Sequence, residues 1–498
     1  MKAKISIFII ALFALAFLEP LLTAQPAGNR VELSAYIDVS SDGNATVKIA
    51  IQYKGRATFF MTLPKFQPVY LCNETGIGKL NIQNETSSAY FYYNSTITIN
   101  DDNPGRLVLC YSFPSAVLMA GTRGWFMSPL LWTNFDKVSV YVSLPMAKKI
   151  TYESPVSTSI SGNYRVYTLS AGIPQDIGNR VTIEFDLKEN VKENILQEKT
   201  PQTIITVKYP VFYRNIAENT LKTAIKSIQY LNNLTGVTPR NVTLVFYLPE
   251  KKMGGIYALG FVLGEDVNAG GKGPIYLNLA LTRYAPGYME TTIIHELVHV
   301  YLGMVGVEAN DATRWFHEGM AQYLSIKIAE AIGINVSEYK NDMYNSSKAL
   351  YYYYTGGKFG FIQKWPSDDV SEQEAYLASF YIIANISDSY GGLSYAQRVF
   401  SELRKHPVST SSDIVIVLSQ AAGRNLAPFF RSLGFSNIQD WSPTPSAGNT
   451  VATKDPPLLS GYMSLIVALG LSLLIFLVVY YGNFEINQKL KMGNFEML

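Results

Sequence analysis

The sequence predicts a multidomain protein with an N-terminal all-β, sandwich-like domain, an α+β domain and a C-terminal transmembrane helix. The chain has 498 residues, which is too many for one small domain, so we expect two folded domains with appended segments. Three observations support this prediction. Short runs rich in β-branched and aromatic residues fill the N-terminal part, helical patterns dominate after about residue 200, and a long uncharged stretch lies near the C-terminus.

Residues 1–24 have the pattern of a signal peptide. Lys2 and Lys4 precede an apolar run, and Ala24 supplies a small residue at which a signal peptidase would cut. The alternative is an uncleaved N-terminal anchor, which a slightly longer apolar run would permit.

Residues 29–195 are predicted to form the β domain. Short runs rich in Val, Ile, Tyr and Thr are separated by Gly, Asn, Asp and Pro, which is typical of a sandwich or a related antiparallel architecture. No catalytic constellation occurs among these residues. The runs are VELSAYIDV, ATVKIAIQY, AYFYYNSTITI, RLVLCYSF, KVSVYVSLP, YRVYTLS and RVTIEFDL.

Residues 200–441 are predicted to form the α+β domain. Apolar side chains at helical spacing, followed by a Gly, indicate an amphipathic helix in NTLKTAIKSIQYLNNLTG. The runs VTLVFYL and PIYLNLAL read as strands, and from Tyr288 to about Trp441 the pattern is mostly helical.

The C-terminal segments predict a membrane anchor. Residues 442–457 have the Ser, Pro and Gly content of a flexible stalk. Residues 458–481 carry no charge, and at about 1.5 Å per residue they span a hydrocarbon core of roughly 30 Å. Lys489 and Lys491 follow in the tail, residues 482–498, which is therefore expected in the cytoplasm. The protein would then be a single-pass cell-membrane protein with its folded domains outside the cell.

The composition agrees with export and gives no sign of nucleic-acid binding. The net charge is +2 and only 16% of residues are charged, with no basic or acidic block. Cys72 and Cys110 are expected to form a disulfide in an oxidising compartment, the alternative being two buried free thiols. Nine Asn-x-Ser/Thr triplets would accept N-glycans, at Asn44, Asn73, Asn84, Asn94, Asn233, Asn241, Asn335, Asn345 and Asn385.

The histidines indicate a metal site. Of four in the chain, His295 and His299 are separated by one helical turn in HELVHVYLG, so that both imidazoles lie on one face of a helix. Two imidazoles, a third ligand and a water make a catalytic zinc site. Glu296 lies beside the first ligand and can reach the water, as in the His-Glu-x-x-His signature of zinc peptidases.

A second helix is expected to bring the third ligand. The 18 residues from Val300 to His317 suffice to end one helix, turn at GVEANDA and return past the first, so that Glu318 and Gly319 face the histidines. The segment HELVHVYLGMVGVEANDATRWFHEGMAQYL resembles the zinc-binding segment of the gluzincins, specifically the aminopeptidase-N-like peptidases. The resemblance covers these 30 residues strongly, is looser over about 200–440, and is not seen in the β domain.

The resemblance implies a thermolysin-like catalytic domain with one zinc per chain. His295, His299 and Glu318 would be the zinc ligands and Glu296 the general base. Tyr376, on a helix after the third ligand, is the nearest equivalent of the family's oxyanion-binding tyrosine; its alternative is a packing role. Tyr381 is the neighbouring tyrosine on the same predicted helix. His317 occupies a position that often holds Asn in the family, and it is expected at the surface or behind a ligand. His406 is expected to be an ordinary residue at the end of a helix.

The substrate-binding strand departs from the family pattern. Aminopeptidases of the family carry a Gly-x-Met-Glu-Asn strand whose Glu binds the substrate amine. Here the stretch GGIYALG, which starts at Gly254, has no acid, and Glu265 and Asp266 lie beyond it in a Gly-rich region expected to be a loop. The choice between amino- and endopeptidase stays open, although the missing acid favours an enzyme that does not depend on a free N-terminus. The backbone of GGIYALG is expected to pair with an extended substrate.

The sequence therefore predicts a membrane-anchored extracellular zinc metallopeptidase acting on peptides or proteins. One alternative is a cell-surface binding or scaffold protein with a degenerate peptidase domain. Another is an enzyme of related fold with a non-peptide substrate. Other divalent metals also suit the ligand set.

Overall fold

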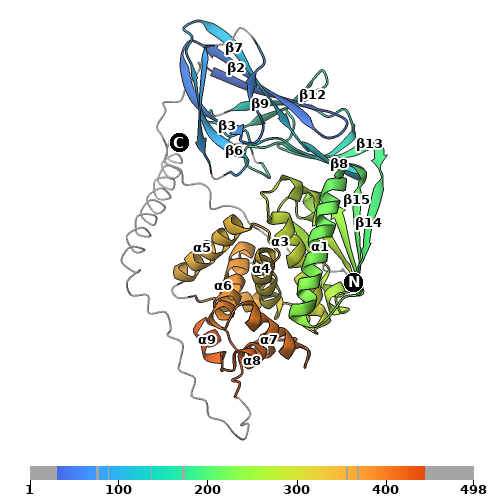
Figure 1. The fold of residues 1–498 in the computed structure, drawn as a ribbon. Helices are drawn as coiled ribbons and strands as arrows, with labels where there is room; N and C mark the ends of the chain where they lie inside the picture. The colour runs from blue at the N-terminus through green and yellow to red at the C-terminus, as the bar shows by residue number, and fades with distance from the viewer. Residues whose placement is uncertain are drawn as a thin grey trace, which may run out of the picture. The chain divides into compact units, whose positions relative to one another are not determined.

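A computed structural model describes residues 31–442, except 74–77, 88, 136, 171–172, 174, 355–356 and 367–369. The predicted signal peptide, transmembrane helix and cytoplasmic tail, and all but the first residue of the stalk, lie outside the described residues. Within the described part, no helix is both long and apolar enough to cross a membrane. The folded part consists of an N-terminal β region of several sheets and a C-terminal, mainly helical region (Figure 1).

Three sheets make up the β region. The largest has seven strands in the order β11-β12-β9-β1-β2-β7-β4, and two others have three strands each, β10-β13-β8 and β3-β6-β5. The strands are β1 (Val31–Val39), β2 (Ala45–Lys54), β3 (Ala57–Pro64), β4 (Tyr70–Leu71), β5 (Leu80–Thr86), β6 (Tyr92–Ile99), β7 (Pro104–Phe113), β8 (Val117–Met127), β9 (Val138–Ser143), β10 (Ala147–Ser154), β11 (Ser159–Ser161), β12 (Tyr164–Leu169) and β13 (Thr182–Val191).

Each of the seven runs singled out in the sequence contains a strand. In β1 the alternation of apolar and polar residues places every second side chain in the core of the β region. The predicted runs do not include strands β3, β4, β5, β8, β10 and β11. In β8, Gly121 and Gly124 interrupt the pattern. The structure gives a reason for Gly124: a Cβ there would lie 2.5 Å from the Phe185 ring on β13, so only glycine permits this close pairing.

The predicted disulfide between Cys72 and Cys110 is present. Cys110 lies on β7 and Cys72 follows β4, the strand that pairs with β7, so the pairing brings the two Cα atoms to 5.9 Å. A disulfide is typical of extracellular or secretory proteins.

The C-terminal region begins with a five-stranded sheet and continues as helices. The strand order is β14-β15-β16-β18-β17, with β15, β16 and β18 parallel and both edge strands antiparallel to their neighbours. The strands are β14 (Glu193–Lys199), β15 (Ile204–Pro210), β16 (Asn241–Tyr247), β17 (Gly260–Val262) and β18 (Pro274–Asn278). The helices are α1 (Arg214–Thr235), α2 (Gly264–Asn268), α3 (Tyr288–Met304), α4 (Arg314–Ala331), α5 (Ser337–Tyr353), α6 (Glu372–Ser389), α7 (Leu393–Leu403), α8 (Ser411–Ala422) and α9 (Ala427–Ser432).

The local signals in the sequence explain these helices. Gly236 ends α1 with a φ of 70°, the left-handed conformation that glycine adopts without strain. Thr410 and Asp413 form a capping box at the start of α8.

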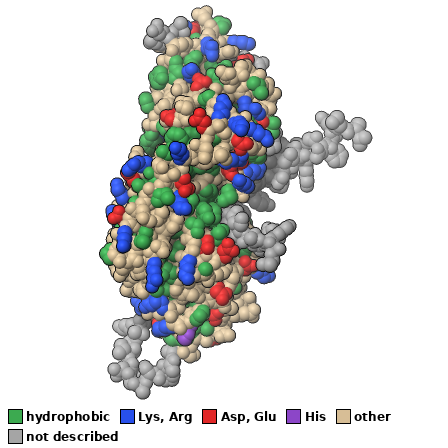
Figure 2. All heavy atoms as spheres, turned by 90° about the vertical axis from the view of Figure 1, so that its right-hand side faces the viewer, with side chains coloured by type: hydrophobic (Ala, Val, Ile, Leu, Met, Phe, Trp, Pro, Cys, Tyr) green, Lys and Arg blue, Asp and Glu red, His purple; other side chains and the backbone are tan. Residues whose placement is uncertain are grey.

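The surface is lightly charged, and on the face drawn in Figure 2 acidic and basic side chains lie among a majority of uncharged ones.

Charged side chains join the β region to the loop that follows β16. Arg123 on β8 donates from Nε to Glu250 at 2.6 Å and from Nη1 to Asp186 at 2.7 Å. Glu184 on β13 accepts the backbone N–H of Lys251 at 2.5 Å. Burial raises the pKa of Glu250, but hydrogen bonds from Lys252 and Arg123 outweigh burial and lower it overall. The loop between β16 and β17 is thus held by the β region.

We expect Arg123→Met to lower the free energy of unfolding, because the nearly buried Glu184 would lose its cation and the nearly buried Glu250 would keep only Lys252. The loss should be about 2 kcal/mol, below the roughly 3–5 kcal/mol of fully buried pairs, because water reaches the guanidinium. Urea unfolding followed by circular dichroism measures the change. Arg214→Met removes an exposed pair with Glu218 and should leave the midpoint unchanged. An equal effect of both variants would contradict the role given to Arg123.

Candidate metal centre

Helices α3 and α4 are central helices of the C-terminal region. From Thr291 to Gly303 every residue of α3 is buried, and in α4 all but one residue from Trp315 to Ala329 are buried. Such a helix is apolar on most faces rather than on one stripe. His295, Glu296, His299 and Glu318 are therefore polar exceptions in an apolar interior, where an ionisable group needs a partner.

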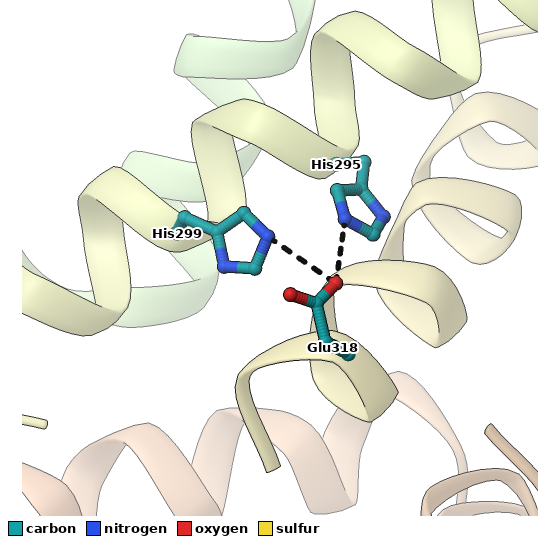
Figure 3. A group of neighbouring side chains, drawn as sticks. All are labelled: His295, His299 and Glu318. Carbon is teal, nitrogen blue, oxygen red and sulfur yellow. Dashed lines mark hydrogen bonds and ion pairs between the residues drawn. The ribbon is translucent and has the colours of Figure 1, made fainter. Parts of the chain in front are cut away.

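The two helices bring the three predicted ligands together, as the sequence predicted. His295 and His299 project from adjacent turns of α3 towards Glu318 on α4 (Figure 3). The Nε2 atom of His295 lies 3.2 Å from Oε2 of Glu318, and Nε2 of His299 lies 3.7 Å from the same oxygen. One ligand atom from each residue lies within 4.8 Å of the other two, and all three side chains are buried.

These residues could hold a metal ion. Two imidazole nitrogens and one carboxylate form a donor set that zinc and related divalent metals accept. Oε1 of Glu318 and Nδ1 of His295 are buried without a hydrogen-bond partner among the described residues. A fully buried carboxylate needs a positive charge close by to stabilise it. A cation bound between the three side chains would supply that charge.

Burial also favours the forms that bind a metal. It lowers the pKa of His299 well below the usual range, with a further contribution from His295, so this imidazole stays neutral near pH 7. A neutral imidazole has a free lone pair for a metal ion.

Glu296 lies next to the ligands but does not join them. Both of its carboxylate oxygens are buried and have no partner in the described part of the chain. Burial, and then the charge of Glu318, raises its pKa well above the usual value. A carboxyl group with raised pKa and free oxygens is typical of a proton acceptor at a reaction site.

The edge strand β17 passes directly over Glu296. A Cβ on Gly260 would lie 2.9 Å from Oε1 of Glu296, so glycine lets the backbone approach the carboxylate. The expectation that GGIYALG begins a strand at Gly254 is wrong. Gly254 and Gly255 have φ values of 89° and 64° and form a turn after a short 3-10 helix, and the strand begins only at Gly260. Glu265 and Asp266, expected in a loop, lie on α2.

Helix α6 carries both Tyr376 and Tyr381. A Cβ on Gly319 of α4 would lie 2.6 Å from the carbonyl oxygen of Ser379, so this glycine allows α6 to pack closely behind Glu318. Tyr376 is buried against Trp365, with ring centroids 4.9 Å apart. Burial and the nearby charge of Glu318 raise its pKa well above the usual value. Tyr381 instead stacks on Tyr351 at 4.6 Å.

Two further residues lie near the ligands. His317 is fully buried, its Nδ1 lies 3.5 Å from Nδ1 of His299, and burial lowers its pKa to about 4. Arg314 forms an ion pair with Glu372 at 3.2 Å, stacks 4.2 Å from the Trp365 ring and lowers the pKa of His299 slightly. His317 could be suspected from its place beside Glu318. Arg314 could not, because its partners are far away in the sequence.

Comparison with known proteins does not identify a family for this chain. No protein-family model matches the chain, and no curated protein is similar to it.

Proposed function

We propose that the protein is a membrane-anchored extracellular zinc metallopeptidase of the gluzincin type. The observation that supports this most is the buried group of His295, His299 and Glu318, with Glu296 beside it, whose carboxylate has no hydrogen-bond partner among the described residues. A structural zinc site is normally closed by four protein ligands. Three ligands and a neighbouring carboxylate suit hydrolysis better.

In the proposed reaction Glu296 moves the protons. Zinc bound by the three ligands would lower the pKa of a water molecule and polarise the substrate carbonyl. The Glu296 carboxylate accepts a proton from the attacking water and delivers it to the leaving nitrogen. Its raised pKa suits both steps, because the group must gain a proton and lose it again. The backbone of Gly260, against which Glu296 packs, limits the directions in which the carboxylate can turn.

Tyr376 is the proposed donor to the carbonyl oxygen as negative charge develops there. Burial keeps its hydroxyl protonated, and a pre-positioned donor in a water-poor site stabilises an oxyanion. Its helix packs against the helix of Glu318, and its pKa responds to that carboxylate.

Tyr376→Phe should therefore lower kcat strongly, by about 10²–10³-fold, with little change in KM, because the hydroxyl serves the transition state alone. Tyr381→Phe is the matched control on the same helix and should leave both constants unchanged. Steady-state kinetics on one cleaved peptide measures this. If Tyr381→Phe is damaging and Tyr376→Phe is silent, the donor has been assigned to the wrong turn of α6.

The proposed substrates are extracellular peptides or proteins cleaved without need of a free N-terminus. The edge strand β17 carries Gly260, Phe261 and Val262, and no acidic residue on it can bind an ammonium group. β17 is the last strand of its sheet, and the proposed substrate would pair with it beside Glu296.

Incubation of the full-length chain with a diverse peptide mixture tests the function. Cleavage that stops with a chelator and returns with zinc supports the peptidase. A degenerate binding protein would leave every peptide intact. An enzyme with a non-peptide substrate would also leave the peptides intact, yet would bind zinc.

The proposed location outside the cell rests on the disulfide and on the sequence of the two ends. The Cys72–Cys110 bridge suits an oxidising compartment. Anchoring by residues 458–481 and glycosylation of the Asn-x-Ser/Thr triplets remain parts of this proposal.

A further inference from the structure

The buried ring of His317 contacts the backbone of Glu308 and Val307 on one side and the ring of His299 on the other. Nε2 lies 3.2 Å from the backbone carbonyl oxygen of Glu308. A carbonyl oxygen only accepts, so this nitrogen carries the proton. In a neutral ring the other nitrogen, Nδ1, then has a free lone pair. That atom faces Nδ1 of His299 at 3.5 Å.

The same reasoning defines the ring of His299. Its Nε2 faces Glu318 and is the atom available to a metal. A neutral imidazole that binds a metal through Nε2 carries its proton on Nδ1. The Nδ1–H of His299 therefore points at the lone pair of His317. The hydrogen bonds run in one direction, from His299 to His317 and from His317 to the Glu308 carbonyl.

The end of this chain of hydrogen bonds is fixed to the fold. Glu308 lies in the loop between α3 and α4, and its backbone N–H donates to the carbonyl oxygen of Val408 at 2.9 Å. Its carbonyl oxygen also accepts a hydrogen bond from the Thr313 hydroxyl. The acceptor for His317 is thus held from two sides before any metal binds.

The other histidine ligand has no such support. Nδ1 of His295 is buried and lacks a partner among the residues that the structure describes. The two imidazoles therefore differ at Nδ1: that of His299 faces His317, and that of His295 has no hydrogen-bond partner in the described part of the chain.

We propose that His317 is a positioning residue for the metal site: it accepts the Nδ1–H of His299, fixes the tautomer and orientation of that ring, and so raises the affinity for a divalent metal. This inference rests on the proposed metal site. In many metal sites a carboxylate or a carbonyl oxygen fills this position, and losing such a partner weakens metal binding about 10–100-fold. Here a neutral imidazole does so without adding a charge to the buried site.

Three substitutions at this position test the role, with zinc affinity of the full-length chain measured by competition with a coloured chelator. His317→Leu removes both contacts and should weaken zinc binding about 10–100-fold. His317→Asn places an amide oxygen near the former Nδ1 and should bind zinc almost as tightly as the wild type. His317→Gln places its amide nearer the former Nε2 and should bind as weakly as His317→Leu.

The control is Gln322→Leu on α4, the helix of His317, which removes a buried hydrogen bond to Tyr339 on α5 and changes no ligand. It should leave zinc affinity unchanged. The visible spectrum of the cobalt-substituted protein gives a second readout, and it should change in the Leu and Gln variants but not in the Asn variant. If His317→Leu fails to fold, the difference in zinc affinity between His317→Asn and His317→Gln tests the role of His317.

Equal affinities for wild type, Asn and Gln variants would overturn the role of His317 while leaving the metal site intact. Equal losses in the Asn and Gln variants would also overturn it, because the position of the acceptor would not matter. A folded wild-type chain that binds no zinc would overturn the metal site itself, and with it this inference.

Discussion

Glu296→Gln is expected to keep zinc bound and to lose nearly all turnover. The amide preserves the shape of the side chain and its packing against Gly260, but it cannot accept the proton from water. Loss of a general base costs about two to four orders of magnitude. The fall should appear in kcat and in kcat/KM alike, because the proton is transferred only on the way to the transition state.

Glu290→Gln is the matched control for this change. Glu290 lies in the first turn of α3, outside the buried group, and carries the same chemical substitution on the same helix. Its kinetics should equal those of the wild type. Near-native activity of Glu296→Gln, with zinc still bound, would remove Glu296 from the reaction.

Substitution of a ligand is expected to abolish metal binding. His295→Ala and Glu318→Ala each leave two of three donors, and the affinity for zinc should fall well beyond the roughly 10–100-fold loss caused by removing a supporting residue. Activity should fall with it. Glu318→Ala also removes a buried carboxylate whose charge, without a cation, opposes folding, so its metal-free form should be at least as stable as the metal-free wild type.

His406→Ala is the control for the loss of a histidine. His406 is exposed, lies after α7 and is not part of the buried group, so zinc affinity should not change. Zinc occupancy at the wild-type level in His295→Ala or Glu318→Ala would show that the ligands are assigned wrongly. Chelator titration followed by mass spectrometry of the intact chain distinguishes these results.

The metal-binding group could be predicted because its signals are local. His295 and His299 are one helical turn apart, and their alignment follows from helix geometry alone. Glu318 follows after a distance that allows one turn and a second antiparallel helix. The strands β1 and β2 could also be predicted, since alternating apolar residues define the buried face of each strand.

Features that depend on distant contacts could not be predicted. Strand β8 contains two glycines, and Gly124 is required by Phe185, which lies on another strand. The turn at Gly254 and Gly255 reads as extended in the sequence, yet the loop is held by charged side chains of the β region. Arg314 contacts Trp365 and Glu372, which are adjacent only after α6 has packed on α4.

The chemical role of His317 shows the same limit at the site itself. Its place in the sequence allowed either a surface position or one behind a ligand. The structure puts it behind His299, and that outcome depends on the Glu308 carbonyl, which only the folded loop between α3 and α4 presents.

The most direct measurement is the metal content of the purified full-length chain, determined by elemental analysis after removal of loosely bound ions. The proposed site predicts one zinc per chain, lost on dialysis against a strong chelator and regained on adding zinc. A folded chain with its disulfide intact that contains no transition metal, and takes up none when zinc is added, would contradict it.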